Sequence, residues 1–129
     1  QCTYNIMEQS ILKLKEIFLQ NNRQLIIKES LANGRLMPNI HFREHQELYI
    51  YISKLAEKYN VGADAISIRF CMDSFPNAVT LSGASSNDQL RSNLAAKTFK
   101  LQKEEIHLLH SYKIDPITYW DDRTKLPWQ

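Results

Sequence analysis

His41, Glu44 and His45 have a spacing that is found in zinc enzymes. They match the pattern H-x-x-E-H, in which two histidines one helical turn apart bind the metal and the glutamate activates water. The surrounding stretch is polar and borders a segment without hydrophobic periodicity. This context favours a solvated helix start, so we expect no metal site here.

His107 and His110 form a second candidate pair. Side chains three positions apart lie on the same side of a helix, and two imidazoles placed in this way can share a metal ion. The neighbouring residues Glu104 and Glu105 instead indicate an ordinary exposed helix face. We expect no metal ligand in this pair either.

The overall composition limits the classes of protein to which the chain can belong. It has 129 residues, which is the length of one domain, and 43% of them are hydrophobic, with three glycines and four prolines. This balance excludes disordered and low-complexity chains. Sixteen basic against fourteen acidic residues, evenly interspersed, leave a net charge of +2 and indicate neither nucleic acid nor an anionic membrane as a partner.

Cys2 and Cys71 lie far apart in the sequence and form no C-x-x-C pair, so the sequence predicts neither a disulfide framework nor a structural zinc site. No apolar run approaches the roughly 20 residues of a spanning helix, and no segment has the order of a signal peptide. We therefore expect a reducing compartment, the cytoplasm, with an organelle stroma as an alternative. The apolar, strand-like start at Gln1 suggests a piece of a longer chain.

The hydrophobic pattern predicts strands that alternate with helices. Strands are expected at residues 2–7, 24–28 and 78–81, helices at 10–20, 48–59, 64–74, 86–95 and 103–111, and an irregular aromatic tail from residue 115 onward. Strands that alternate with helices pair in parallel, so the fold class is α/β. Three parallel strands leave two open edges, and this order therefore resembles half of a larger sheet or barrel.

Four stretches, in the right order, resemble the carboxyl-terminal half of the aldo-keto reductases. They are QCTYNIME at 1–8, LANGRL at 31–36, LAEKYNV with IRF at 55–61 and 68–70, and LSGASSNDQLRSNL at 81–94. The resemblance implies a partial TIM (β/α)8 barrel, in which residues 1–129 supply strands 6 to 8, their helices and a C-terminal tail. It also implies NADP(H), or NAD(H), as the cofactor.

By this resemblance, Gln1 hydrogen-bonds the carboxamide of the nicotinamide, a task that suits a side-chain amide because it both donates and accepts. Lys28 stands where many members have an aromatic residue that stacks on the nicotinamide ring. Leu31 and Ala32 belong to the loop that lies along the pyrophosphate.

The same resemblance assigns the adenosine end of the cofactor to the segment after the third strand. Gly83, Ala84 and Ser85 fall where backbone N–H groups and a hydroxyl can meet the adenosine phosphate at a helix N-terminus. Gln89 and Asn93, one turn apart, match positions that contact the adenosine. Ser92 replaces a glutamate that holds the adenine.

The position that clamps a 2′-phosphate in NADPH-specific members is not matched. No arginine or lysine lies between Ser85 and Gln89, so the sequence leaves NADPH and NADH open. Arg35, Arg43 and Arg91 are the candidates that remain.

The resemblance also implies which reaction the parent protein performs. Family members transfer hydride from NAD(P)H to an aldehyde or ketone, with a tyrosine as proton donor and a lysine, an aspartate and a histidine from the first half of the barrel. That half is not in this sequence, so we assign no catalytic residue to the chain. Two functions stay open: the cofactor-binding half of a reductase that acts on a small carbonyl substrate, and a truncated, non-catalytic remnant that binds a nucleotide or a partner. The aromatic tail is expected to pack against the barrel wall, or to border the substrate.

Overall fold

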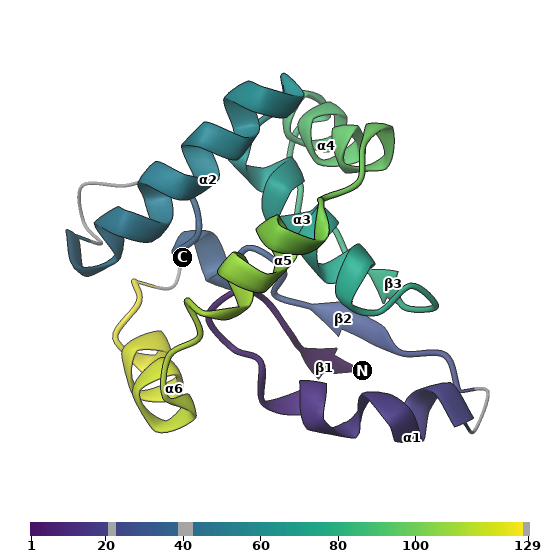
Figure 1. Cartoon of the computed structure of the whole chain (residues 1–129). Coiled ribbons are helices and arrows are strands. Elements are labelled where there is room, and N and C mark those ends of the chain that lie inside the picture. Colours follow the sequence, from purple (N-terminus) through teal and green to yellow (C-terminus); the bar gives the residue numbers. More distant parts are fainter. Residues whose placement is uncertain (21–22, 39–42, 128–129) are drawn as a thin grey trace.

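A computed structural model of the chain describes residues 1–20, 23–38 and 43–127 (Figure 1). The strands are β1 (Cys2–Thr3), β2 (Ile26–Lys28) and β3 (Val79–Thr80). The α-helices are α1 (Lys15–Gln20), α2 (Gln46–Tyr59), α3 (Ala63–Ser74), α4 (Asn87–Leu94), α5 (Lys103–His110) and α6 (Pro116–Thr124). Short 3-10 turns cover Ser10–Leu14, Ala32–Gly34, Arg43–His45 and Ala95–Thr98.

The three strands form one parallel sheet in the order β1-β2-β3, so the predicted α/β class and parallel pairing are confirmed. Cys2 lies opposite Ile27, and Ile27 lies opposite Thr80. Because parallel strands point the same way, their carboxyl ends meet at one edge of the sheet. Lys28, the Leu31–Ala32 loop and the Gly83–Ser85 turn lie at or after that edge, whereas Gln1 directly precedes β1.

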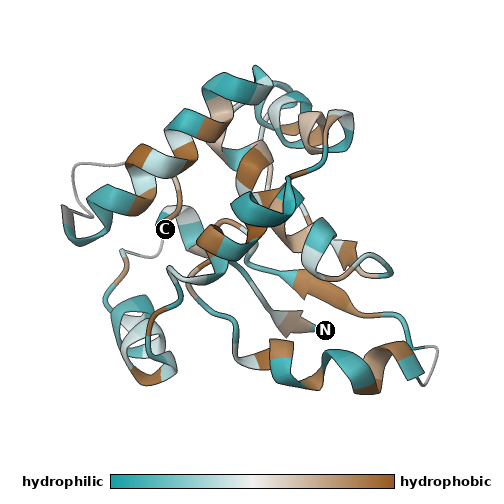
Figure 2. Ribbon diagram, viewed as in Figure 1, coloured by the Kyte–Doolittle hydropathy of each residue, from teal (hydrophilic) through white to brown (hydrophobic). Residues whose placement is uncertain are grey.

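The two faces of the sheet differ in burial. Ile27 in the middle of β2 is fully buried, whereas its neighbours Ile26 and Lys28 are exposed. Val79, which lies opposite Ile26 in the register, is exposed as well. Figure 2 shows β2 as a hydrophobic strand, in line with its two isoleucines. One face is therefore covered by helices, and the other leaves apolar side chains uncovered, as the inner face of an incomplete barrel does.

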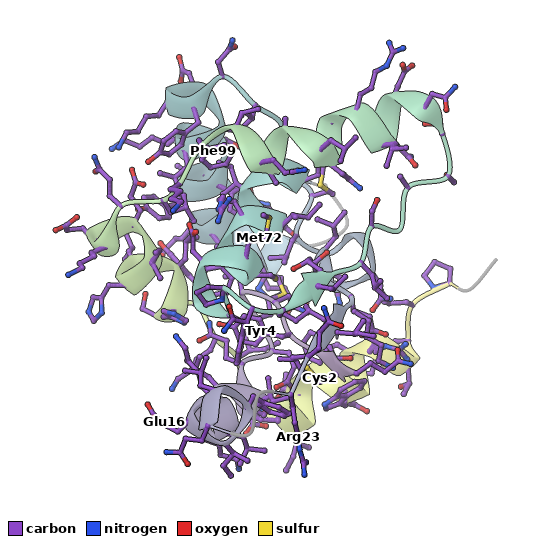
Figure 3. The ribbon with its side chains drawn as sticks, turned by 90° about the vertical axis from the view of Figure 1, so that its right-hand side faces the viewer. Cys2, Tyr4, Glu16, Arg23, Met72 and Phe99 are labelled. Carbon is purple, nitrogen blue, oxygen red and sulfur yellow. The ribbon has the colours of Figure 1, made fainter. Side chains whose placement is uncertain are left out.

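Helix α3 lies centrally between α2, α4 and α5 (Figure 1), and most of its residues are buried. It faces the segment after β1 through aromatic contacts. The ring of Tyr4, labelled in the middle of the molecule in Figure 3, stacks on Phe70 at 5.7 Å and meets Phe75 edge-on at 4.9 Å. These contacts fix β1 against α3, and the carboxyl edge of the sheet is thereby held rigid.

The expectation of an irregular tail is wrong for residues 116–124, which form α6. Asp115 is the N-cap and its carboxylate accepts a hydrogen bond from the N–H of Thr118 at 3.1 Å. Pro116 occupies the first helical position, where a missing N–H costs nothing. Tyr119 anchors the helix because its side chain is completely buried.

His110 is held by two neighbouring side chains. Its Nδ1 lies 2.8 Å from Oε1 of Gln9, and its ring meets Phe70 at 4.8 Å. Burial lowers the pKa of His110, and the nearby cations Lys15, His107 and Lys113 lower it further. The neutral ring is thus the form that the fold stabilises.

This lowered pKa predicts a dependence of stability on pH. The unfolded state binds the proton more readily than the folded state, so the stabilising effect of His110 is complete above the ordinary histidine pKa of about 6.5 and is lost as the pH falls below it. A His110→Gln variant should lose less thermal stability than the wild type when the pH is lowered from about 7.5 to about 5.5. His107→Gln, on the exposed side of the same helix, is the matched control. Equal losses in wild type and His110→Gln would contradict the prediction.

Candidate functional site

Gln1 and Lys28 are brought together. Both line a cavity of about 340 Å³ on the uncovered side of the sheet, together with Thr3, Glu8 and Trp120. Gln1 comes directly before β1, and Lys28 ends β2. The cavity thus presents an amide, an ammonium group and the edge of an indole whose side chain is 43% exposed. Such a set can hold a flat heteroaromatic group that carries an amide.

Helix α6 forms one wall of this cavity and is fixed by polar contacts to the ends of two strands. The hydroxyl of Tyr119 accepts a hydrogen bond from Nδ2 of Asn5 at 3.0 Å. Arg123 pairs with Glu29, the residue after β2, at 2.5 Å. These contacts place Trp120 at the cavity, and the guanidinium of Arg123 lies 5.6 Å from the centre of its ring.

Leu31 and Ala32 lie in a tightly wound loop after β2. Glu29, Ala32 and Asn33 all have positive φ angles of 50–59°, which L-residues adopt at a cost of about 1–2 kcal/mol each. Ala32 is fully buried and Leu31 is half-buried, so in this conformation the loop offers a ligand mainly its backbone. Arg35 holds the loop, because its Nε donates to the carbonyl of Ala32 at 3.0 Å.

The Gly83–Ser85 turn lies at the same edge of the sheet, after β3. Ser86 is the N-cap of α4, and its hydroxyl accepts from the N–H of Gln89 at 3.2 Å. Oε1 of Gln89 accepts in turn from the N–H of Ser85 at 2.8 Å and from its hydroxyl at 3.0 Å. The two donors of Ser85 therefore point at one acceptor oxygen, as they would at a phosphate oxygen.

A Cβ atom built on Gly83 meets nothing within 4 Å, so nothing in the described chain fills the space above this backbone. The predicted pair behind the turn is split by burial: Gln89 is exposed, whereas Asn93 is buried against Ser82 and Asp64. A phosphate bound at Ser85 would replace the side chain of Gln89 as the acceptor for the exposed N–H and hydroxyl of Ser85. The turn therefore presents two exposed hydrogen-bond donors that an anion could share.

The three arginines considered as phosphate clamps lie in different surroundings. Arg35 is only 2% exposed, and its guanidinium stacks over the ring of Tyr119 at 4.1 Å, so it faces the core. Arg91 lies on the exposed surface of α4. The side chain of Arg43 lies outside what the structure describes.

No group of three or more histidine, cysteine or acidic side chains gathers as a metal site within the part of the chain that the structure describes. His41 of the H-x-x-E-H motif lies outside the described residues. His45, at the start of α2, has a pKa lowered chiefly by burial. Within the described ranges, no helix has the length and hydrophobicity needed to cross a membrane.

Sequence reasoning missed Glu8 as a cavity residue and Asp64 behind the Gly83–Ser85 turn, and it included Trp120 only as part of an aromatic tail that it expected to be irregular. A signal for Trp120 was present: Asp115 followed by Pro116 is a typical helix start, and it would have placed Trp120 on an ordered helix. No sequence signal marks Glu8 or Asp64, because their positions depend on contacts between distant segments.

A sequence model of the aldo/keto reductase family matches residues 1–114 of the chain. The chain belongs to the aldo/keto reductase family. Among solved structures, a thermostable aldo-keto reductase, Tm1743, crystallised with the inhibitor epalrestat, is similar with a TM-score of 0.68 and 23% identity over 85% of this chain. Gox0644, in its apo form, is similar with a TM-score of 0.66 and 17% identity over 85% of this chain.

At these identities, the two solved structures show a shared fold. This aldo/keto reductase chain spans only 38% of the length of Tm1743 and 35% of the length of Gox0644. A search of curated protein sequences found no match. The parallel sheet with one uncovered face is consistent with part of a barrel.

Proposed function

We propose that this chain is the cofactor-binding part of a reductase that transfers hydride from NAD(P)H to an aldehyde or ketone. The observation that carries the proposal is that a cavity and a pair of exposed hydrogen-bond donors lie along one sheet. The cavity of Gln1 and Lys28 lies at β1 and β2, and the donors of Ser85 follow β3. A dinucleotide has two ends joined by a pyrophosphate, and the Leu31–Ala32 loop follows β2, the middle strand of the sheet.

The Gln1 cavity and the Ser85 turn each have suitable chemistry for one half of the cofactor. At the first, the Gln1 amide donates to and accepts from the nicotinamide carboxamide, while Trp120 offers an apolar wall. At the second, the N–H and hydroxyl of Ser85 donate to the adenosine phosphate, and Gly83 and Ala84 let the backbone approach it. The exposed Gln89 contacts the adenosine, whereas Asn93, predicted as a second contact, is buried and supports the turn from behind. The bound cofactor supplies the hydride.

In this proposal the chain represents strands 6 to 8 of the barrel, and residues 1–129 are the carboxyl-terminal part of the domain. A first half supplies the tyrosine that protonates the small carbonyl substrate and the lysine, aspartate and histidine that assist it. Tyr4 does not replace that proton donor: its side chain is fully buried against Phe70, and burial raises its pKa far above the ordinary value. We propose a cytoplasmic protein without nucleic-acid or membrane partners.

The choice between NADPH and NADH depends on Arg91 in this proposal. Since Arg35 is buried against Tyr119, Arg91 is the exposed candidate on the helix that bears Gln89 and Asn93. An arginine guanidinium can bind a 2′-phosphate through two parallel hydrogen bonds. We therefore propose NADP(H) as the preferred cofactor, and NAD(H) as the second.

The uncovered face of the sheet favours one alternative function. Ile26 and Val79 lie side by side on that face and are both exposed. A second copy of the chain that covered them would make a non-catalytic remnant that binds a nucleotide or a partner. Carbonyl-dependent oxidation of NADPH by a protein that includes the proposed first half of the barrel distinguishes the reductase from this remnant.

The substitution Gly83→Ala tests the assignment of the turn. The added methyl group meets no atom within 4 Å, so the free energy of unfolding should change by less than about 0.5 kcal/mol. It would occupy the space through which a phosphate approaches the backbone, and the Kd for NADPH should rise about tenfold, measured by fluorescence titration. The Kd for nicotinamide mononucleotide, which does not reach the turn, should stay constant. Unchanged affinity for NADPH would remove the turn from the site.

A further inference from the structure

Asp64, in the first turn of α3, is a buried carboxylate that lies against α4. It is 6% exposed, and none of the ion pairs found among residues 1–20, 23–38 and 43–127 includes it. A buried carboxylate without a cation is costly unless hydrogen-bond donors surround it. Its donors come from α4, the helix that carries the predicted adenosine contacts.

Two side chains of α4 donate to this carboxylate. The hydroxyl of Ser92 donates to Oδ1 of Asp64 at 2.8 Å. One end of the Asn93 amide lies 2.5 Å from Oδ2 of Asp64, and the other end lies 2.7 Å from Oγ of Ser82. With the nitrogen toward Ser82, the amide oxygen would face the acceptor Oδ2, so the nitrogen is assigned to Asp64 and the oxygen to the hydroxyl of Ser82. A carboxylate only accepts hydrogen bonds, so it turns the nitrogen of Asn93 toward itself and the oxygen toward Ser82.

The chain of hydrogen bonds ends in the Gly83–Ser85 turn. The hydroxyl of Ser82 donates its proton to the amide oxygen of Asn93. Its oxygen accepts a hydrogen bond from the backbone N–H of Ala84 at 3.2 Å. Asp64 thus orients the amide of Asn93 and, through it, the hydroxyl proton of Ser82, whereas the N–H of Ala84 donates to Ser82 in either orientation of the amide. If Asn93 reversed its amide, Ser82 would lose its acceptor.

Gly62 shows how closely this arrangement is packed. A Cβ atom at Gly62 would lie 2.3 Å from Oδ1 of Asp64 and 2.8 Å from Oγ of Ser92. Real Cβ atoms do not approach other atoms so closely, so any larger residue at this position would displace the carboxylate. The backbone before α3 therefore leaves just enough room for Asp64 to reach α4.

We propose that Asp64 is a positioning residue for the adenosine end of the cofactor: through Asn93 and Ser82 it fixes the Gly83–Ser85 turn in the shape that binds phosphate. This inference rests on the proposed function. It adds a residue of α3, outside the turn and outside α4, to the determinants of nucleotide affinity.

The test uses Asp64→Ala in the intact protein, with 2′,5′-ADP and nicotinamide mononucleotide as probes. We expect the Kd for 2′,5′-ADP to rise about tenfold, because the turn is no longer held. The Kd for nicotinamide mononucleotide should not change, whereas a general loss of structure would affect both probes. Glu57→Ala, which removes an exposed carboxylate from α2, is the control for the change in charge and should bind both probes as the wild type does.

Ser82→Ala provides a second test that leaves Asp64 and its two donors intact. It removes only the hydrogen bonds of Ser82, so the Kd for 2′,5′-ADP should again rise severalfold. If Asp64→Ala does not fold, this variant alone tests the inference. A folded Asp64→Ala, or a Ser82→Ala, that binds 2′,5′-ADP as the wild type does would overturn the inference alone. A wild-type protein that binds neither 2′,5′-ADP nor NADPH would overturn the proposed function, and the inference with it.

Discussion

The 129-residue chain alone should not oxidise NADPH when an aldehyde is added. The proton donor and the three residues that assist it are proposed to come from the first half of the barrel, and Tyr4, the tyrosine directly after β1, is buried and engaged with aromatic rings. A positioned general acid contributes about 10²–10⁴-fold to the rate, so turnover without it should fall by at least this factor. The measurement is the decrease of NADPH absorbance with and without aldehyde.

Addition of the first half of an aldo/keto reductase barrel is the complementary experiment. It supplies the proton donor and covers the exposed face around Ile26 and Val79, so activity should appear only in the mixture. A mixture with Gly83→Ala is the control, since it should need more NADPH for the same rate. Turnover by the 129-residue chain alone would contradict our account of where the proton donor lies.

Replacement of Tyr119 by alanine should have the largest effect on stability. The side chain is completely buried, its hydroxyl accepts from Asn5, and the guanidinium of Arg35 lies 4.1 Å from the centre of its ring. Removal of a buried aromatic ring costs about 3–5 kcal/mol. The loss should appear as a lower free energy of unfolding in urea and as a weaker Kd for nicotinamide mononucleotide, because α6 carries the cavity wall at Trp120.

Tyr119→Phe separates packing from hydrogen bonding. It keeps the ring beneath Arg35 and removes only the acceptor for Asn5, so the cost should be near 1 kcal/mol. If Tyr119→Ala and Tyr119→Phe were equally stable, α6 would not be held by the packing that we describe.

The fold could largely be predicted from the sequence, because its signals are local. The consecutive Leu25, Ile26 and Ile27 predict a strand, and the Ser86 cap marks the start of α4. The strands are shorter than predicted, since pairing depends on neighbours along the sheet. The tail was misjudged because its aromatic residues have no clear helical period, although Asp115 and Pro116 mark a helix start.

The site could be predicted only in part. The motifs indicate Gln1, Lys28 and Ser85 as ligand contacts, and the structure gathers Gln1 and Lys28 at one cavity. Whether these residues bind a cofactor stays a prediction. No local pattern could have identified Asp64. Its contacts with α4 depend on the orientation of the Asn93 amide and on the absence of a side chain at Gly62.

The most direct test of the account is an NMR titration of the intact, isotope-labelled protein with NADPH and its two halves. We predict that NADPH shifts the side-chain amide of Gln1 and the backbone amide of Ser85 in the same titration, with one common Kd. 2′,5′-ADP should shift only the Ser85 signal, and nicotinamide mononucleotide only that of Gln1. Shifts by NADPH at a single one of these positions, or at neither, would contradict the claim that one dinucleotide spans the sheet from β1 to β3.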